Sequence, residues 1–240
     1  MHHGTHAETI CLWGFRGGVG RLPKRLPSSG KVHDIDIWPD LPVSDCRQPC
    51  RGILSGSDFA LATVGIGFLL YLLPDHGASL QLTRQGLALH PWQLVSGHLV
   101  HWSPSHLAGN ACALLLLARL AGERAPPPMW ALAGLLLCSA TMIAALPDLA
   151  FYRGSSTLVA IHLMPAAATL WQRGGRPRRA AAVLVAVYLA HLLSQAFGLD
   201  SSPLLPANVR STWELHLLGL GWGGIGLLLP QRNLSSRPSS

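Results

Sequence analysis

Six long stretches of the chain contain no charged residue, and this pattern limits the possible folds more than any other feature. The stretches are 59–73, 102–118, 125–147, 154–172, 180–199 and 215–231. Each has about 15 to 23 residues, close to the ~20 that a helix needs to cross a bilayer. Only 12% of the chain is charged, against roughly 25% in soluble domains. The sequence therefore predicts an all-α membrane protein with six transmembrane helices.

The basic residues alternate between the two sides of this predicted bundle. Of the 18 Lys and Arg residues, 15 fall in the two tails and the second and fourth loops. The other loops hold Arg84, Arg153 and Arg210. Because cytoplasmic loops are enriched in Lys and Arg, both termini are predicted to be cytoplasmic. Topology thus explains the net charge of +7, and no nucleic-acid partner is predicted.

Three parts of the chain follow from this pattern. Residues 1–55 have no apolar period and are predicted to be a disordered cytoplasmic tail. Residues 56–230 form the predicted six-helix membrane domain, and 231–240 a cytoplasmic C-terminal tail. Five cysteines, an odd number, argue against a disulfide framework. No cofactor or metal site is predicted.

Polar residues recur at one depth in three of the predicted helices. His106 and Asn110 are spaced i and i+4, so they project from one face near the start of the second apolar stretch. Ser155 and Ser156 open the fourth, and the sixth predicted helix opens with "STWELH", which places His216 about a turn inside it. With alternating helix directions, all three starts lie on the outer side. Polar groups at membrane depth are costly, which indicates a functional site.

Two glycines place His216 against a neighbouring helix. His216, Gly219 and Gly223 follow at i, i+3 and i+7, so they form one stripe along the sixth predicted helix. Glycines on one stripe let transmembrane helices approach closely. His216 is therefore predicted to face a packed neighbour instead of lipid.

These residues resemble the rhomboid family of intramembrane serine proteases over about residues 55–230. The segment "HLAGN" (His106 to Asn110) is similar to the family's His-xxx-Asn, with His101 as the upstream histidine. The segment "GSST" (Gly154 to Thr157) resembles Gly-x-Ser-x, and "HLLGLGWG" (His216 to Gly223) resembles His-xx-Gly-xxx-Gly. The "PWQLVSGHLVH" segment resembles the family's first loop.

The resemblance implies a role for each matching residue. Ser156 would be the nucleophile and His216 the base, while His106 and Asn110 would bind the oxyanion. His101, Gly154, Gly219 and Gly223 would support the site. The compact core and "FYRGSS" lean toward the rhombosortase branch. That branch would release exported proteins from C-terminal, Gly-Gly-containing membrane anchors in the inner membrane of Gram-negative bacteria.

Three positions depart from the family pattern. Thr157 replaces the usual glycine after the nucleophile, and a β-branched residue there is expected to widen the contact with the sixth helix. Ala160 stands where many relatives have an aromatic residue or a histidine, and His162 follows two residues later. The first-loop Trp-Arg pair is Trp92-Gln93.

The residues also predict a mechanism with two members. An alcohol needs a base to become a nucleophile at neutral pH. Glu214 is two positions from His216 and so does not share its helical face, which leaves a Ser-His dyad without a carboxylate. The substrate would be a transmembrane segment, single-pass or C-terminally anchored, cut near its outer end. Segments rich in Gly, Ala or Pro would unwind most easily.

Two other functions are compatible with the same residues. One is a catalytically inactive rhomboid-like protein that binds transmembrane helices. The other is a small transporter, disfavoured because its polar residues would continue across the membrane, whereas here they gather at one end.

Overall fold

The structure is a computed structural model, and it describes residues 55–199, 205 and 209–228. The predictions for the two tails, 1–55 and 231–240, lie outside the described residues, except for residue 55. The described part is mostly helical and contains seven α-helices. They are α1 (Gly56–Tyr71), α2 (Gln93–Ser96), α3 (Pro104–Ala121), α4 (Pro128–Ala145), α5 (Ser156–Gln172), α6 (Gly175–Ala196) and α7 (Trp213–Gly226).

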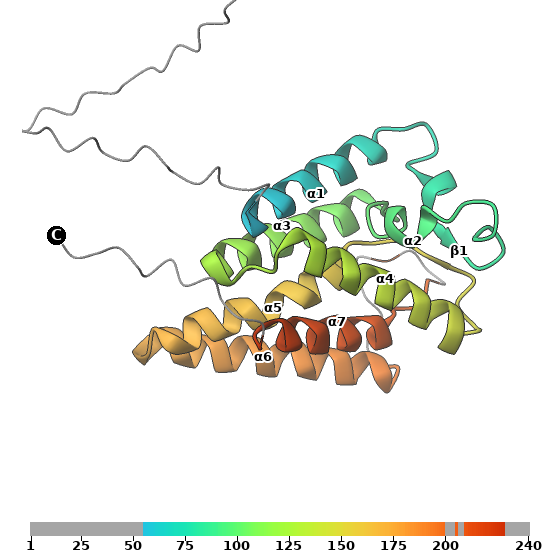
Figure 1. Cartoon of the computed structure of the whole chain (residues 1–240). Helices are drawn as coiled ribbons and strands as arrows, with labels where there is room; N and C mark the ends of the chain where they lie inside the picture. Colours follow the sequence, from blue (N-terminus) through green and yellow to red (C-terminus); the bar gives the residue numbers. More distant parts are fainter. Residues whose placement is uncertain (1–54, 200–204, 206–208, 229–240) are drawn as a thin grey trace, which may run out of the picture. The chain divides into compact units, whose positions relative to one another are not determined.

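Short elements fill the connections. They are the 3-10 helices η1 (Ala78–Leu80) and η2 (Gly122–Arg124), and the strands β1 (Leu82–Thr83) and β2 (Phe151–Tyr152). The two strands pair antiparallel, with Leu82 opposite Tyr152 and Thr83 opposite Phe151. Figure 1 shows β1 and α2 beside the end of the bundle at which α3 starts. This small ribbon therefore holds the chain in place directly before α5.

Local sequence explains where the helices begin. The Ser103 hydroxyl accepts the N–H of His106 at 3.1 Å, and Pro104 occupies the first turn of α3. Ser55 and Asp58 form a reciprocal capping box at the start of α1. Such caps satisfy N–H groups that have no partner inside the helix. They fix the first turns, and the start of α3 thereby sets the positions of His106 and Asn110.

Helix α5 is the centre of the bundle. It contacts α3, α4, α6 and α7, and nine of its residues are buried. One core cluster joins α5 to α1, α3 and α4; its buried members are Ala60, Leu114, Ala118, Ala131, Leu135, Leu158 and Ile161. A residue at the start of α5 is thus held by most of the fold.

Helices α4 and α7 are tied together by a pair of tryptophans. The rings of Trp130 and Trp222 stack with centroids 4.2 Å apart. Each indole N–H donates to the other residue's carbonyl, at 3.3 Å from Trp130 and 2.9 Å from Trp222. The C-terminal end of α4 is also anchored, since the guanidinium of Arg84 donates to the carbonyls of Met142, Ile143 and Leu146.

Two helices of the described part are long and apolar enough to cross a membrane. They are α4, with a mean hydropathy of 1.7, and α6, with 1.4. Helix α1 is apolar but has only 16 residues, and α7 has only 14. The six apolar stretches of the sequence thus correspond to six long helices, of which two have the length and composition of membrane spans.

Candidate functional site

Gly154 sets the path of the chain into α5. Its φ is +133°, a backbone conformation open essentially to glycine alone. A Cβ at this position would also lie 2.8 Å from His106 Cε1 and 3.6 Å from Asn110 Nδ2. The residues that the sequence assigned to the oxyanion are therefore in direct contact with the turn that precedes Ser156.

Ser156 and His216 form a hydrogen bond across α5 and α7. Ser156 Oγ lies 2.8 Å from His216 Nε2. The other ring nitrogen, Nδ1, is buried and has no hydrogen-bond partner within the described ranges. Glu214 is instead paired with Arg210 one turn earlier. The arrangement is a serine–histidine pair without a carboxylate on the histidine.

The glycine stripe of α7 brings these two side chains together. A Cβ on Gly219 would lie 3.0 Å from the Thr157 carbonyl oxygen, and one on Gly223 would lie 2.2 Å from the Ile161 carbonyl oxygen. A Cβ would collide with the α5 backbone at Gly223 and would be tightly packed against it at Gly219, so this close approach of α7 to α5 depends on glycine. The close packing follows the sequence pattern.

His106 and Asn110 lie on α3, facing the same turn. Both are buried, with 7% and 9% of their surface exposed. Asn110 Nδ2 and His106 Nδ1 have no hydrogen-bond partner in the part of the chain that the structure describes. A buried amide N–H₂ without an acceptor is costly. Its free donors are available to a ligand oxygen beside Ser156.

A cavity of about 130 Å³ joins these groups. Its lining brings together the start of α5, the first turns of α3 and α7, and the last turns of α6. The residues that line it are Trp102, His106, Asn110, Phe151, Tyr152, Arg153, Ser156, His191, Gln195, Leu205, Val209, Arg210, Ser211, Thr212 and His216. The cavity is large enough for water, and polar side chains from four helices line it.

His101 supports the neighbouring serine. The N–H of Ser155 donates to His101 Nε2 at 3.4 Å, and Ser155 Oγ lies 3.2 Å from the same nitrogen. The His101 ring packs edge-on against His106, with centroids 5.2 Å apart. Two adjacent serines thus have different histidine partners, and only Ser156 reaches the cavity.

His98, to which the sequence assigned no role, is fully buried. Its Nε2 lies 2.9 Å from Ser139 Oγ, and Ser139 donates to the Leu94 carbonyl at 2.7 Å. Its ring lies against Tyr152, with centroids 4.9 Å apart. Burial lowers the pKa of His98 to about 4, so the ring is neutral at pH 7. It links α4 to the residues that precede α5.

Tyr152 is a site residue that sequence reasoning missed. Its buried hydroxyl donates to the Gly154 carbonyl at 2.8 Å and lies 3.4 Å from Ser156 Oγ and 3.0 Å from Thr157 Oγ1. Burial raises the pKa of Tyr152 to about 12, so the hydroxyl stays protonated. The sequence did offer one signal for this role, since Tyr152 lies only four residues before the candidate nucleophile Ser156.

The departures from the family pattern are accommodated by local contacts. Thr157 is fully buried, its hydroxyl lies near Tyr152, and the approach of Gly219 to its carbonyl remains close. Gln93 is buried, and its Oε1 accepts the backbone N–H of Thr83 at 3.3 Å and the Thr83 hydroxyl at 3.0 Å.

His162 and Ala160 are both buried within α5. Nδ1 of His162 lies 2.8 Å from the Leu158 carbonyl oxygen. Ala160 packs beside Gly219.

Within the described ranges, no group of three or more His, Cys, Asp or Glu side chains is placed to hold a metal ion. The arrangement has a hydroxyl next to an imidazole nitrogen, with N–H donors beside it that have no partner in the described part of the chain. Such a set can activate an alcohol and bind a developing oxyanion. Comparisons of the chain with models of protein families, with curated proteins and with solved structures found no match.

Proposed function

We propose that this chain is an intramembrane serine protease of the rhomboid type, with Ser156 as nucleophile and His216 as base. The observation that carries the proposal is the 2.8 Å contact between Ser156 Oγ and His216 Nε2. It joins two helix starts that are 60 residues apart in sequence. The neighbouring oxyanion candidates, His106 and Asn110, line the same cavity.

The geometry suits acyl transfer to serine. His216 Nε2 accepts the Ser156 proton as Oγ attacks the carbonyl carbon of the scissile bond. The resulting imidazolium then gives that proton to the departing amine, and an acyl-enzyme remains. Water attacks the acyl-enzyme in the same way, with His216 again as the base, which releases the carboxylate product and restores Ser156.

Donors for the tetrahedral oxyanion come from two helices. The Asn110 amide and a His106 ring N–H are on α3, and the Ser156 backbone N–H is at the start of α5. The N-cap residue Ser155 makes no side-chain hydrogen bond to this first turn. Unpaired N–H groups at a helix N-terminus favour negative charge there.

The exposed surfaces of α1 and α6 support a membrane setting. Helix α6 has only two buried residues, Ala181 and Leu192, and it exposes Val183, Val187 and Leu193 by 58–63%. Helix α1 similarly exposes Leu61, Phe68 and Leu69. Apolar surface on this scale requires a partner or lipid. We infer a six-helix bundle in a bacterial inner membrane, with both termini in the cytoplasm.

The substrate we propose is a transmembrane segment cut near its outer end. By resemblance to the rhombosortase branch, it is the C-terminal anchor of an exported protein. A cavity lined by polar side chains at the ends of the helices is what a water-consuming reaction needs, because water is scarce at the membrane centre. Because these polar side chains gather at one end of the helices and do not continue along them, they argue against a transport path.

The decisive experiment is labelling with a serine-directed fluorophosphonate, together with release of a co-expressed anchored substrate. Ser156→Ala should fold and insert but lose both labelling and release. Ser155→Ala is the matched control, since Ser155 bonds His101 and not His216, and it should keep labelling. Folded wild-type protein that shows no Ser156 adduct would favour a helix-binding protein without protease activity. Loss of cleavage in Ser155→Ala alone would show that the nucleophile is the neighbouring serine.

A further inference from the structure

Arg153 places a cation on the wall of the cavity that contains Ser156 and His216. It follows β2 directly and precedes Ser156 by three residues. Its guanidinium carbon lies 4.4 Å from the centroid of the Trp102 ring, and its Nε donates to Gln81 Oε1 at 2.8 Å. Stacking and the hydrogen bond from Nε thus fix the plane of the guanidinium.

The charge of Arg153 is not neutralised by an ion pair anywhere in the described ranges. The carboxylate whose charge influences Arg153 is Asp75, and its oxygens already accept the N–H groups of Gly77 and Ser79. Burial lowers the pKa of Arg153, and the charge of Asp75 opposes this shift. The two Nη groups of Arg153 have no acceptor among the described residues. They remain able to form a two-point contact with a carboxylate.

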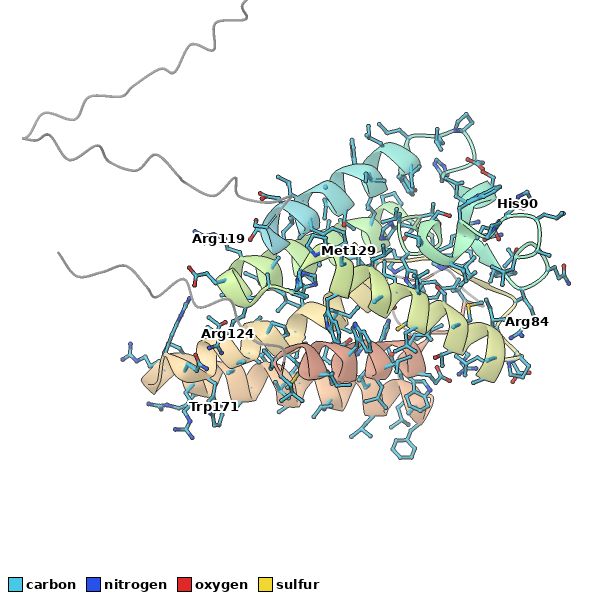
Figure 2. All side chains as sticks on the ribbon, viewed as in Figure 1. Arg84, His90, Arg119, Arg124, Met129 and Trp171 are labelled. Carbon is cyan, nitrogen blue, oxygen red and sulfur yellow. The ribbon has the colours of Figure 1, made fainter. Side chains whose placement is uncertain are left out.

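The other arginines at this end of the bundle are engaged. Arg84 donates to carbonyls at the end of α4, and Figure 2 shows it beside that end. Arg210 is paired with Glu214. A half-buried guanidinium that is held in place on a cavity wall, without an anion, indicates a site for a ligand anion.

We propose that Arg153 binds an acidic side chain of the substrate close to the scissile bond, so that the enzyme prefers segments with Asp or Glu there. This inference rests on the proposed function, because it assumes that a polypeptide occupies the cavity. Arginine–carboxylate pairs are two-point contacts with defined geometry, which makes them selective. Arg153 is a specificity residue in this scheme and takes no part in the proton transfers.

A lipid phosphate is the competing anion at a membrane boundary. Two features favour the substrate. Arg153 shares the cavity with the reacting serine, and its side chain is held by Trp102 and Gln81 instead of extending freely as surface arginines do. The two sources can be separated, because a lipid site would not depend on the charge of the peptide.

The test uses the full-length chain with Ser156→Ala, so that binding is measured without cleavage. A Gly- and Ala-rich transmembrane peptide is prepared as a series. One position at a time along its outer third is Asp, with Asn and Lys at the same position as controls. Binding is followed by fluorescence anisotropy in phosphatidylcholine vesicles. At one or two positions the Asp peptide should bind about tenfold more tightly than the Asn peptide, the scale of one charge-assisted contact.

Charge reversal gives the sharpest readout. In the Ser156→Ala background, Arg153→Glu should reverse the preference, so that the Lys peptide binds more tightly than the Asp peptide at the same position. Arg119→Glu makes the same charge change at the exposed end of α3, far from Arg84 in Figure 2, and should keep the wild-type preference. Equal affinities along the whole series, or an Asp preference that survives Arg153→Glu, would overturn the inference.

Two further arms separate the remaining explanations. Phosphatidylcholine and phosphatidylglycerol both carry a phosphate. If Arg153 binds lipid phosphate, Arg153→Glu will therefore change the affinity of the Asp and Asn peptides equally, and more strongly when the anionic phosphatidylglycerol is added; that result also overturns the inference. Cleavage of the same peptides is measured with Ser156 intact. If the peptides are cleaved but their binding shows no charge preference, the Arg153 site is refuted and the protease proposal stands. If binding shows the charge preference but there is neither cleavage nor fluorophosphonate labelling, the protease proposal is refuted and the Arg153 site stands.

Discussion

The hydroxyl groups of Tyr152, Ser156 and Thr157 meet at the start of α5. The hydrogen bond that Tyr152 donates determines which of them can donate to the others. The single proton of Tyr152 goes to the Gly154 carbonyl, so toward Ser156 and Thr157 the tyrosine oxygen can only accept. At 3.4 Å its contact with Ser156 Oγ is long, whereas His216 Nε2 is 2.8 Å away. The Ser156 proton is therefore directed to the histidine. Tyr152 positions the turn and does not compete with the base.

Asn110→Ala separates oxyanion binding from helix packing. Because Asn110 Nδ2 has no partner in the described structure, its removal should cost little stability. Turnover should fall by about 10²- to 10³-fold, the scale seen when one oxyanion donor is lost, with little change in substrate binding. The measurements are kcat and KM on a cleavable segment, with the thermal midpoint recorded in parallel.

Asn110→Asp is the matched control for this prediction. It keeps the size of the side chain but replaces the amide donor by an acceptor, so its turnover should be at least as low as that of Asn110→Ala. A stable Asn110→Ala protein with undiminished turnover would remove this residue from the mechanism. A large loss of stability with near-normal turnover would show that Asn110 is a packing residue.

His98 should make the fold sensitive to mild acid. Its pKa is lowered by burial from 6.5 to about 4, so the unfolded chain binds the proton more readily than the folded chain. The stability that neutral His98 provides is complete above pH 6.5 and is lost as the pH falls toward 4. The loss is up to about 3 kcal/mol by linkage.

The measurement is the thermal midpoint between pH 7 and pH 4. His98→Gln keeps a polar partner for Ser139 but does not titrate, so its midpoint should fall less steeply across this range. Some slope will remain, because burial also lowers the pKa of His101, to about 3. His90→Gln, a change of an exposed histidine, should leave the wild-type slope intact. Equal slopes for His98→Gln and wild type would refute the assignment.

At the scale of helices, the contact between α5 and α7 depends on glycine at defined positions. A Cβ on Gly223 would lie 2.2 Å from the Ile161 carbonyl oxygen, whereas one on Gly221 would have no atom within 4 Å. Gly223→Ala should therefore destabilise the protein by about 1–3 kcal/mol, as overpacking does. It should also lower labelling of Ser156 by displacing His216. Thermal unfolding in detergent and fluorophosphonate labelling measure the two effects.

Gly221→Ala is the matched control on the same helix. Alanine favours helix over glycine by up to about 1 kcal/mol, so this variant should be as stable as wild type or slightly more so. If both variants behave alike, the close approach of α7 to α5 does not depend on Gly223.

Elements with a strong sequence period were predictable, and those built from long-range contacts were not. The start of α3 follows from Ser103 and Pro104, and the glycine face of α7 from its spacing alone. The two-residue strands β1 and β2 carry no period, so nothing local indicates that Leu82 pairs with Tyr152. Consequently the role of Tyr152, which that pairing positions, could not be read from the sequence.

The same limit applies to the histidines. The spacing of His106 and Asn110 predicts a shared face, because both lie on one helix. His98 and His101 lie in the connection before α3, where partners come from distant segments: Ser139 on α4 for one and Ser155 before α5 for the other. Thr157 turns its hydroxyl to Tyr152 and its methyl group to Gly219, a placement that also depends on a distant segment.

At the scale of the whole described bundle, most of the arginines lie at the end opposite the cavity. Arg119 and Arg124 lie at one end of the bundle, together with Trp171, and Arg84 lies at the other, as Figure 2 shows. Arg173, Arg176, Arg178 and Arg179 follow the end of α5 or open α6. The cavity is formed by the starts of α3, α5 and α7. The basic end is therefore the one remote from Ser156.

The positive-inside rule turns this separation into a topology prediction. An epitope tag inserted after Gly174, in the turn between α5 and α6, should be cytoplasmic. One inserted after His90, in the exposed connection between β1 and α2, should be external. Antibody access in intact spheroplasts and in permeabilised cells measures both positions, and Ser156 labelling shows that each tagged protein is folded. If the Gly174 tag is the external one, the serine opens toward the cytoplasm. Exported proteins would then be excluded as substrates, although the contact between Ser156 and His216 would be unaffected.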